Sequence, residues 1–145
     1  MLRACSNQDM SNVNDTLQTA SHCFVCGPAN PIGLHLQFRL EDNVCRAEFT
    51  PQAHHCGYDG VTHGGIIFSV LDDVMANWIV LQGKQAFTAK VDLRYKDTLA
   101  TGTKVRLEGT CTKARGRLYQ MRATMTRCDN NQLVAECDAS FMAAT

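Results

Sequence analysis

The sequence predicts an α+β domain in which a curved antiparallel sheet wraps round one long central helix. Three observations carry this prediction. One segment of about 17 residues has a helical pattern and is apolar nearly all round. Segments on both sides of it alternate between apolar and polar residues, as strands do. The chain has 145 residues, which suits one domain, and its hydrophobic content of 45% is enough for a substantial core.

Two strands are predicted before the helix. Residues 1–20 are polar and lack the apolar stretch of a signal peptide, so we expect a disordered tail there and a folded domain over 21–145. Leu34–Leu40 alternates and predicts the first strand. Glu41-Asp42-Asn43 predicts a turn into a second strand, Val44–Phe49, and a loop then leads to the helix.

The helix is expected from about Gly65 to Leu81, with Gly83 just past its end, where a positive φ is favoured. Every later segment alternates, which predicts four strands over 87–96, 104–112, 118–127 and 133–142. In the first of them, Phe87, Ala89, Val91, Leu93 and Tyr95 are expected to share one face, with Thr88 on the other. Two strands, one wrapped helix and four strands are the element order of the hotdog fold.

Composition excludes several classes of protein. Lys+Arg and Asp+Glu balance at 14 each, which argues against a general nucleic-acid or anionic-membrane binder. No charge-free apolar run is long enough to cross a membrane. The eight cysteines come without a secretory signal, in a chain with an ample core, so we expect reduced thiols in a cytoplasmic protein.

Two adjacent acids, Asp72 and Asp73, interrupt the apolar helix, which carries no Lys or Arg. Burying a carboxylate is costly unless it is paired, hydrogen-bonded or in a polar cavity, so we expect a water-containing cleft at one of them. Partial desolvation would suit a general base or nucleophile. Asp72 could instead point at solvent or cap a loop. Asp73 lies about 100° further round the helix and is expected to be a supporting or interface acid.

The helix opens on Gly64-Gly65, whose backbone N–H groups lack partners within the helix. Two residues without Cβ let a substrate oxygen come close, which makes a candidate oxyanion hole, although a tight loop-to-helix junction would also use them. Gly64 and Asp72 are about 12 Å apart along a helix. Both can act on one carbonyl only if Asp72 of one chain faces the helix start of another, which favours at least a dimer.

The stretch "HGGIIFSVLDD" resembles the hotdog-fold acyl-CoA thioesterases of the phenylacetate-degradation type, which carry His-Gly-Gly and an acid nine positions after the histidine. The resemblance therefore selects Asp72 after His63, and it assigns Thr88 to holding the catalytic water. "CFVCGPANPIGLHL" (Cys23–Leu36) resembles the opening of one subgroup. Several relatives have Asn six residues before the histidine, where this chain has Gly57.

The resemblance implies hydrolysis of acyl-CoA by a homodimer without cofactor, with pairing of dimers into tetramers left open. Asp72 would act as base or nucleophile, and the Gly65 and Gly64 amides as the oxyanion hole. His63 is a further site candidate, which we expect to be structural rather than catalytic because its ring can hydrogen-bond the incoming loop. Gly57, Tyr58 and Phe68 are expected near the substrate. Basic residues are expected at the CoA phosphates, from Lys90, Arg94, Lys96, Lys113, Arg115 and Arg117.

The Cys23-x-x-Cys26 pair leaves three readings: an ordinary loop with free thiols, a zinc knuckle, or a redox pair. The ordinary loop is favoured and no metal is expected, because a zinc site needs two more ligands. The nearby residues of a type that can bind zinc are only His22, His54, His55 and Cys56. Two other functions stay open: a non-catalytic acyl-CoA or acyl-ligand binder on the same fold, and a dehydratase using His63.

Overall fold

The computed structural model describes residue 13 and residues 19–145, so nearly all of the expected tail over 1–20 lies outside the described residues. In chain order the elements are β1 (Arg39–Glu41), β2 (Val44–Phe49), the short 3-10 helix η1 (Ala53–His55), α2 (Gly64–Val80), β3 (Ala86–Tyr95), β4 (Val105–Arg115), β5 (Leu118–Arg127) and β6 (Leu133–Ala143). The long helix and the last four strands lie within a few residues of their predicted bounds.

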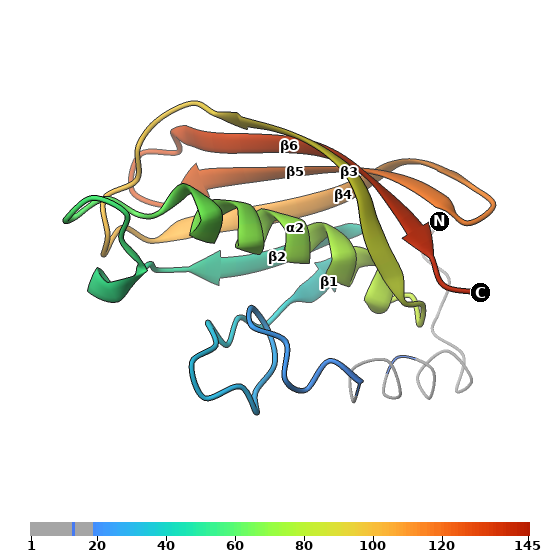
Figure 1. Cartoon of the computed structure of the whole chain (residues 1–145). Coiled ribbons are helices and arrows are strands. Elements are labelled where there is room, and N and C mark those ends of the chain that lie inside the picture. Colours follow the sequence, from blue (N-terminus) through green and yellow to red (C-terminus); the bar gives the residue numbers. More distant parts are fainter. Residues whose placement is uncertain (1–12, 14–18) are drawn as a thin grey trace.

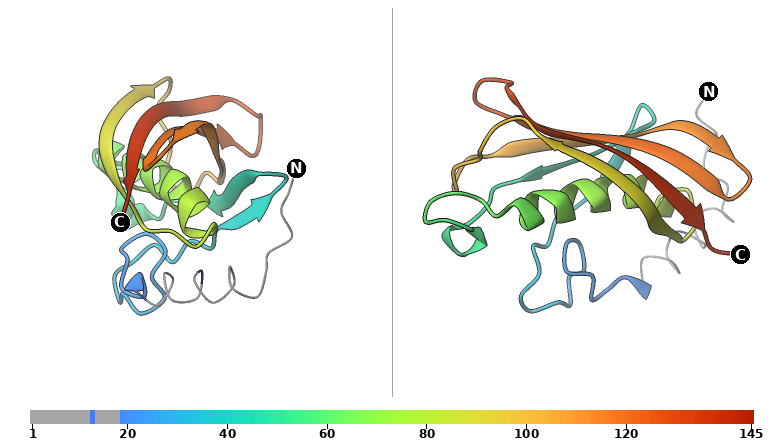
Figure 2. Two further views of the ribbon diagram at one scale, coloured as in Figure 1. Left: turned by 90° about the vertical axis from the view of Figure 1, so that its right-hand side faces the viewer. Right: turned by 45° about the horizontal axis from the view of Figure 1, so that its top comes forward.

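All six strands form one antiparallel sheet in the order β1-β2-β4-β5-β6-β3. The sheet curves over α2 (Figure 1), and the end-on view in Figure 2 shows the helix enclosed by its concave face. The predicted hotdog architecture is confirmed. No helix within the described residues has the length and apolar character needed to span a membrane.

The core fills the space between α2 and the concave face of the sheet. The helix residues that are fully buried there include Val70, Leu71, Val74 and Met75. The indole of Trp78 is also buried, and its Nε1 donates to the backbone oxygen of Asn43 in the β1–β2 turn, 3.0 Å away. The helix is therefore enclosed by apolar contacts on its sheet side, as its composition predicts.

The first predicted strand is largely wrong. Only Arg39–Glu41 pairs as β1, and His35 has a φ of 55°, in the left-handed region. The His35 ring makes a 2.6 Å hydrogen bond to the backbone oxygen of Asn30, so a local turn replaces the extended chain. The alternation of apolar residues still has a physical basis, because Leu36 is buried and Leu34 packs against the core. The predicted turn is confirmed, with positive φ at both Asp42 and Asn43.

Strand β3 contains a bulge that changes which residues face the helix. Thr88 pairs with Phe141 and Lys90 pairs with Ser140, so Ala89 is an extra residue in the ladder. Because one inserted residue reverses the alternation, Thr88 joins the concave face, whereas Phe87 turns outward and is 65% exposed. The expectation that Phe87 shares a face with Val91 and that Thr88 opposes it was therefore wrong.

The segment before β1 crosses beneath α2, on the side away from β5 and β6 (Figures 1 and 2). Val25 and Leu36 are buried and anchor this segment to the core. The seven cysteines among the described residues form no disulfide with one another, and Cys5 lies outside the described residues. The loop therefore closes the open side of the helix and brings Cys23 and Cys26 to it.

Candidate active site

Asp72 lies in the middle of α2 beneath strand β3. Its Oδ1 accepts a 2.6 Å hydrogen bond from the Thr88 hydroxyl, which reaches the helix because of the bulge at Ala89. Burial raises the pKa of the Asp72 carboxyl, and the Thr88 hydrogen bond opposes the shift. A half-buried carboxylate with raised basicity and one fixed oxygen leaves Oδ2 to accept a proton.

The start of α2 is capped by the imidazole of His63. Its Nδ1 accepts a 2.8 Å hydrogen bond from the backbone N–H of Gly65. A Cβ at Gly65 would lie 3.0 Å from this nitrogen, so glycine lets the ring sit over the helix end. Since Nδ1 is the acceptor, Nε2 carries the proton of the neutral ring. The Gly65 amide, predicted as an oxyanion donor, is therefore occupied by His63 in the single chain.

Gly64 differs from Gly65 because its N–H makes no hydrogen bond within the described residues. Its backbone oxygen accepts a 2.8 Å hydrogen bond from Tyr95 Oη, which ties the helix start to the end of β3. A hollow of about 480 Å³ adjoins Gly64 and is lined in part by Thr62, Tyr95 and Lys96. Among the described residues, the buried Thr62 Oγ1 has no hydrogen-bond partner. Gly64 and Thr62 thus both line one hollow, and the Gly64 amide and the buried Thr62 hydroxyl have no hydrogen-bond partner among the described residues.

The carboxylate and the free amide lie on the same helix, eight residues apart. At 1.5 Å of rise per residue, they are separated by about 12 Å. One thioester carbonyl cannot contact both groups of a single chain. A single chain therefore does not bring the predicted base and the predicted oxyanion donors together, and the site stays a prediction that needs a second chain.

The other predicted substrate contacts are scattered. Phe68 is half-buried on α2, one turn before Asp72. Gly57 is exposed in the loop before the helix, and Tyr58 is 86% exposed at the same loop. A larger hollow of about 780 Å³ lies between residues 33–39 and residues 48–55, and neither Asp72 nor Gly64 lines it.

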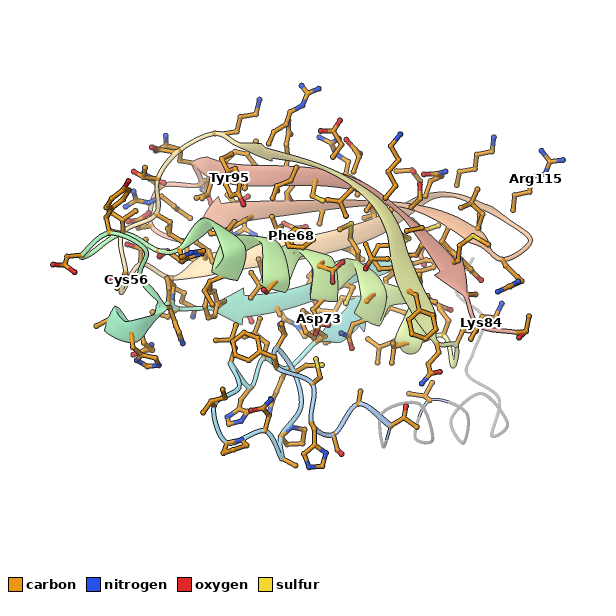
Figure 3. All side chains as sticks on the ribbon, viewed as in Figure 1. Cys56, Phe68, Asp73, Lys84, Tyr95 and Arg115 are labelled. Atoms are coloured by element: carbon orange, nitrogen blue, oxygen red, sulfur yellow. The ribbon has the colours of Figure 1, made fainter. Side chains whose placement is uncertain are left out.

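The basic candidates do not form one cluster. Lys90 and Arg94 lie opposite Ser140 and Glu136 on the outer face of the sheet, so the sheet separates them from Asp72 of their own chain. Arg117 donates to the backbone oxygen of Ala143, and Arg115 projects from the β4–β5 hairpin at the far end of the molecule (Figure 3). Lys96 lines the hollow beside Gly64, 3.5 Å from the carboxylate of Glu136.

Asp73 has surroundings that the sequence did not indicate. It faces the loop beneath the helix (Figure 3), where its carboxylate lies beside Cys23 and Cys26. Asn77 Nδ2 donates to Asp73 Oδ2 at 3.0 Å. The expectation of a supporting acid agrees with these contacts, but no local pattern predicted the thiols, which lie about 50 residues away. Tyr95 and Thr62 were not among the predicted site residues either.

The fold and the family are established by comparison with known proteins. The profile of the thioesterase superfamily matches residues 59–134, which include α2, Asp72 and Thr88. A comparison with curated proteins finds no significant match.

Among solved structures, the Escherichia coli PaaI protein from the phenylacetic acid degradation operon has a TM-score of 0.73 and 13% identity, over 93% of this chain and 95% of that one. A Streptococcus mutans UA159 protein bound to acetyl-CoA has a TM-score of 0.70 and 19% identity, over 75% of this chain and 88% of that one. A conserved Pseudomonas aeruginosa protein reaches 26% identity with a TM-score of 0.68, over 77% and 90% of the two chains.

These structural similarities establish the hotdog fold, and the profile covers more than half of the sequence. With its wrapped helix, its half-buried acid and its His-Gly-Gly helix start, the chain belongs to the thioesterase superfamily.

Proposed function

We propose that the protein hydrolyses acyl-CoA thioesters as a homodimer, with Asp72 of one subunit facing the helix start of the other. The observation that carries the proposal is the half-buried Asp72 carboxylate, held by Thr88 in a chain of the thioesterase superfamily. The acetyl-CoA bound to the S. mutans protein supports a CoA ester as the substrate class.

In the proposed reaction, the thioester carbonyl oxygen accepts a hydrogen bond from the free N–H of Gly64. The N–H of Gly65 becomes a second donor when that oxygen displaces the His63 ring. Asp72 takes a proton from water as the water oxygen bonds to the carbonyl carbon. The tetrahedral intermediate then breaks its C–S bond, and the CoA sulfur leaves as a thiolate that takes the proton held by Asp72, which restores the carboxylate. Direct attack by Asp72 through a mixed anhydride has the same outcome.

A dimer of this kind is compatible with the exposed parts of the chain. Strand β3 is at one edge of the sheet, with its outer edge unpaired within the described residues. A strip of α2 next to it, including Phe68, Ser69 and Asp72, is only half-buried although the helix is apolar. If Asp72 of one antiparallel helix lies opposite residue 65 of the other, the twofold axis passes between Phe68 and Ser69.

We choose the residues proposed to bind CoA by their charge and their position. Lys96 borders the hollow at the helix start, so it is the basic candidate that can accompany a substrate placed at Gly64. Lys90 and Arg94 can contribute only if the nucleotide extends over the outer face of the sheet. Reduced cysteines make the cytoplasm the proposed compartment.

Two other activities are less well supported. A dehydratase would need His63 to work with an acid, but among the described residues the ring is hydrogen-bonded to the Gly65 N–H and to no carboxylate. A pure acyl-CoA binder would have no use for a desolvated carboxylate next to a hydroxyl, since burying it costs stability without adding apolar contact.

The experiment is a panel of acyl-CoA esters with detection of the released thiol, comparing the full chain with Asp72→Asn. Turnover by the wild type and its loss in a folded Asp72→Asn variant would support the proposal. Saturable binding of the same esters without thiol release would establish the binder instead. Undiminished turnover in Asp72→Asn would show that another group is the base.

A further inference from the structure

Two thiols and a carboxylate converge on the side of α2 away from Thr88. Sγ of Cys23 lies 3.8 Å from Asp73 Oδ1 and 3.9 Å from Asp73 Oδ2. The sulfur of Cys26 completes a group whose donor atoms all lie within 4.8 Å of one another. The three residues are partly buried, and this is the one group of its kind among the described residues.

The spacing of these atoms is close to that of a metal site. With Zn–S bonds of about 2.3 Å and Zn–O bonds of about 2.0 Å, neighbouring ligands of a tetrahedral zinc ion are about 3.5 to 3.8 Å apart. The observed separations of 3.8 Å and above are slightly wider. Small side-chain rotations would bring the three donors to bonding distance from one ion.

The carboxylate is already oriented for such a role. Asn77 Nδ2 donates to Asp73 Oδ2 at 3.0 Å and to the backbone oxygen of Asp73 at 2.9 Å. These bonds hold Oδ2 and leave Oδ1 without a hydrogen bond from Asn77, on the side of Cys23. Hydrogen bonds of this kind typically orient the ligands in metal sites.

The loop holds the two sulfurs in place. The N–H of Gly27 donates to the Cys23 oxygen at 2.8 Å, and the N–H of Cys23 donates to the Ala20 oxygen at 3.0 Å. A Cβ at Gly27 would lie 2.2 Å from the Cys23 nitrogen, so only glycine allows this tight turn after the second cysteine. The Cys-x-x-Cys-Gly sequence therefore forms a compact turn whose two thiols face the same carboxylate.

No cationic side chain offsets the Asp73 carboxylate among the described residues. A partly buried carboxylate needs compensating partners, and here they are Asn77 and the two thiols. No Lys or Arg forms an ion pair with Asp73 within the described residues. A divalent cation would neutralise these groups when the thiols ionise.

We propose that Cys23, Cys26 and Asp73 bind one Zn²⁺ ion that fastens the loop over residues 20–36 to α2. Two thiolates favour a borderline-soft ion, and the carboxylate oxygen is a regular zinc ligand. Binding replaces two S–H bonds by two Zn–S bonds and releases two protons to solvent. With three protein ligands, the fourth position takes water.

The site is separate from the proposed thioesterase chemistry. Asp72 and Asp73 are neighbours, but their side chains diverge by about 100° round the helix. Asp72 contacts Thr88 of β3, whereas Asp73 contacts the loop on the opposite side. None of the four sequence-predicted donors, His22, His54, His55 and Cys56, belongs to the cluster. The segment that carries Cys56 lies at the start of α2, away from Asp73 (Figure 3).

The first test measures zinc in the full chain after reconstitution with Zn²⁺ under reducing conditions and removal of free metal. The expected content is about one zinc per chain. Cys23→Ser, Cys26→Ser and Asp73→Asn should each lose it. Cys128→Ser, which changes an exposed cysteine, and Asp72→Asn should retain it. Because no thioester is present, the result is independent of whether the thioesterase proposal holds.

The second test needs no variant and so does not depend on folding of a mutant. Wild-type protein is alkylated under reducing conditions with and without a zinc chelator, and the modified cysteines are mapped by mass spectrometry. Chelation should expose Cys23 and Cys26 to the reagent while leaving the reactivity of Cys128 the same. Only trace zinc after reconstitution, or equal alkylation of the pair in both conditions, would overturn the proposal.

Discussion

Asp72 and Asp73 are adjacent in the chain, yet they lie in two different chemical environments. Asp72 faces the strand side of α2, accepts a hydrogen bond from one hydroxyl and remains half-exposed at the edge of the molecule. Asp73 faces the loop side, where Asn77 and two thiols surround it. One step of helical rotation therefore separates an acid suited to proton transfer from an acid suited to binding a metal.

The largest effects are expected when Asp72 and Asp73 are each replaced by asparagine. Asp72→Asn should lower kcat by about 100- to 10,000-fold, the range typical of a general base, and should leave zinc content the same. Asp73→Asn should abolish zinc binding and keep measurable thioester turnover. Steady-state kinetics and metal analysis on the same preparations check this. Loss of both properties in either folded variant would mean that the two acids form one site.

The next largest effect is expected from removing the free backbone N–H of Gly64 at the helix start. Gly64→Pro removes the N–H, and proline suits the first helical position because His63 has a ψ of 134°, which the residue before proline tolerates. Loss of one oxyanion donor should lower kcat by about 100- to 1,000-fold. Gly64→Ala adds a similar contact with Tyr95 but keeps the N–H. Equal activities in the two variants would show that the Gly64 amide takes no part.

Removal of the proposed zinc ion from Asp73 and its two cysteines should lower the stability of the protein. At free zinc a hundredfold above its Kd, binding contributes about 2.7 kcal/mol to the free energy of unfolding. A chelator should therefore lower Tm in the wild type, by roughly 2–4 °C for each kcal/mol lost in a chain of this size. Calorimetry on Asp73→Asn provides the control, and there the chelator should have no effect. An equal Tm in both conditions for the wild type would contradict the fastening role.

The smallest effect concerns Thr88. Thr88→Val keeps the shape of the side chain and removes a hydrogen bond to a charged group, which is worth about 1.5–3 kcal/mol. Since this bond lowers the pKa of Asp72, its loss should raise that pKa further. Turnover needs the ionised carboxylate, so the acid limb of the kcat/KM profile should move to higher pH. An acid limb at the wild-type position would mean that Asp72 is not the titrating base.

The sequence predicted the fold because hydrophobic periodicity is a local property. Alternation along 118–127 and 133–142 marks strands wherever their partners lie, and an apolar helix must be enclosed. The prediction of which residues face the helix failed before Ala89, because the bulge there reverses the face of every earlier residue in the strand. A bulge leaves no mark on the composition of the strand. Leu34–Leu40 failed similarly, because apolar residues at alternate positions also pack when His35 turns the chain.

Only part of the candidate site could be predicted from the sequence, for a related reason. Gly64, Gly65 and Asp72 lie on one helix capped by His63, so their spacing could be read from the sequence, and the family resemblance chose Asp72 over Asp73 as the predicted acid. The contact of Asp73 with Cys23 joins residues 50 positions apart and has no periodic signal. The capping of Gly65 by His63 depends on a ring orientation that is set by the loop, and this reduces the predicted oxyanion donors to Gly64 in the single chain.

The central claim is that Asp72 of one subunit works with the helix start of the other, and complementation between two inactive variants tests it directly. Asp72→Asn and Gly64→Pro proteins are unfolded together, refolded as a mixture and assayed for thioester hydrolysis. Each mixed dimer then holds one intact site, so an equal mixture should recover about a quarter of wild-type activity. No recovery, although native mass spectrometry detects the mixed dimer, would contradict the shared site.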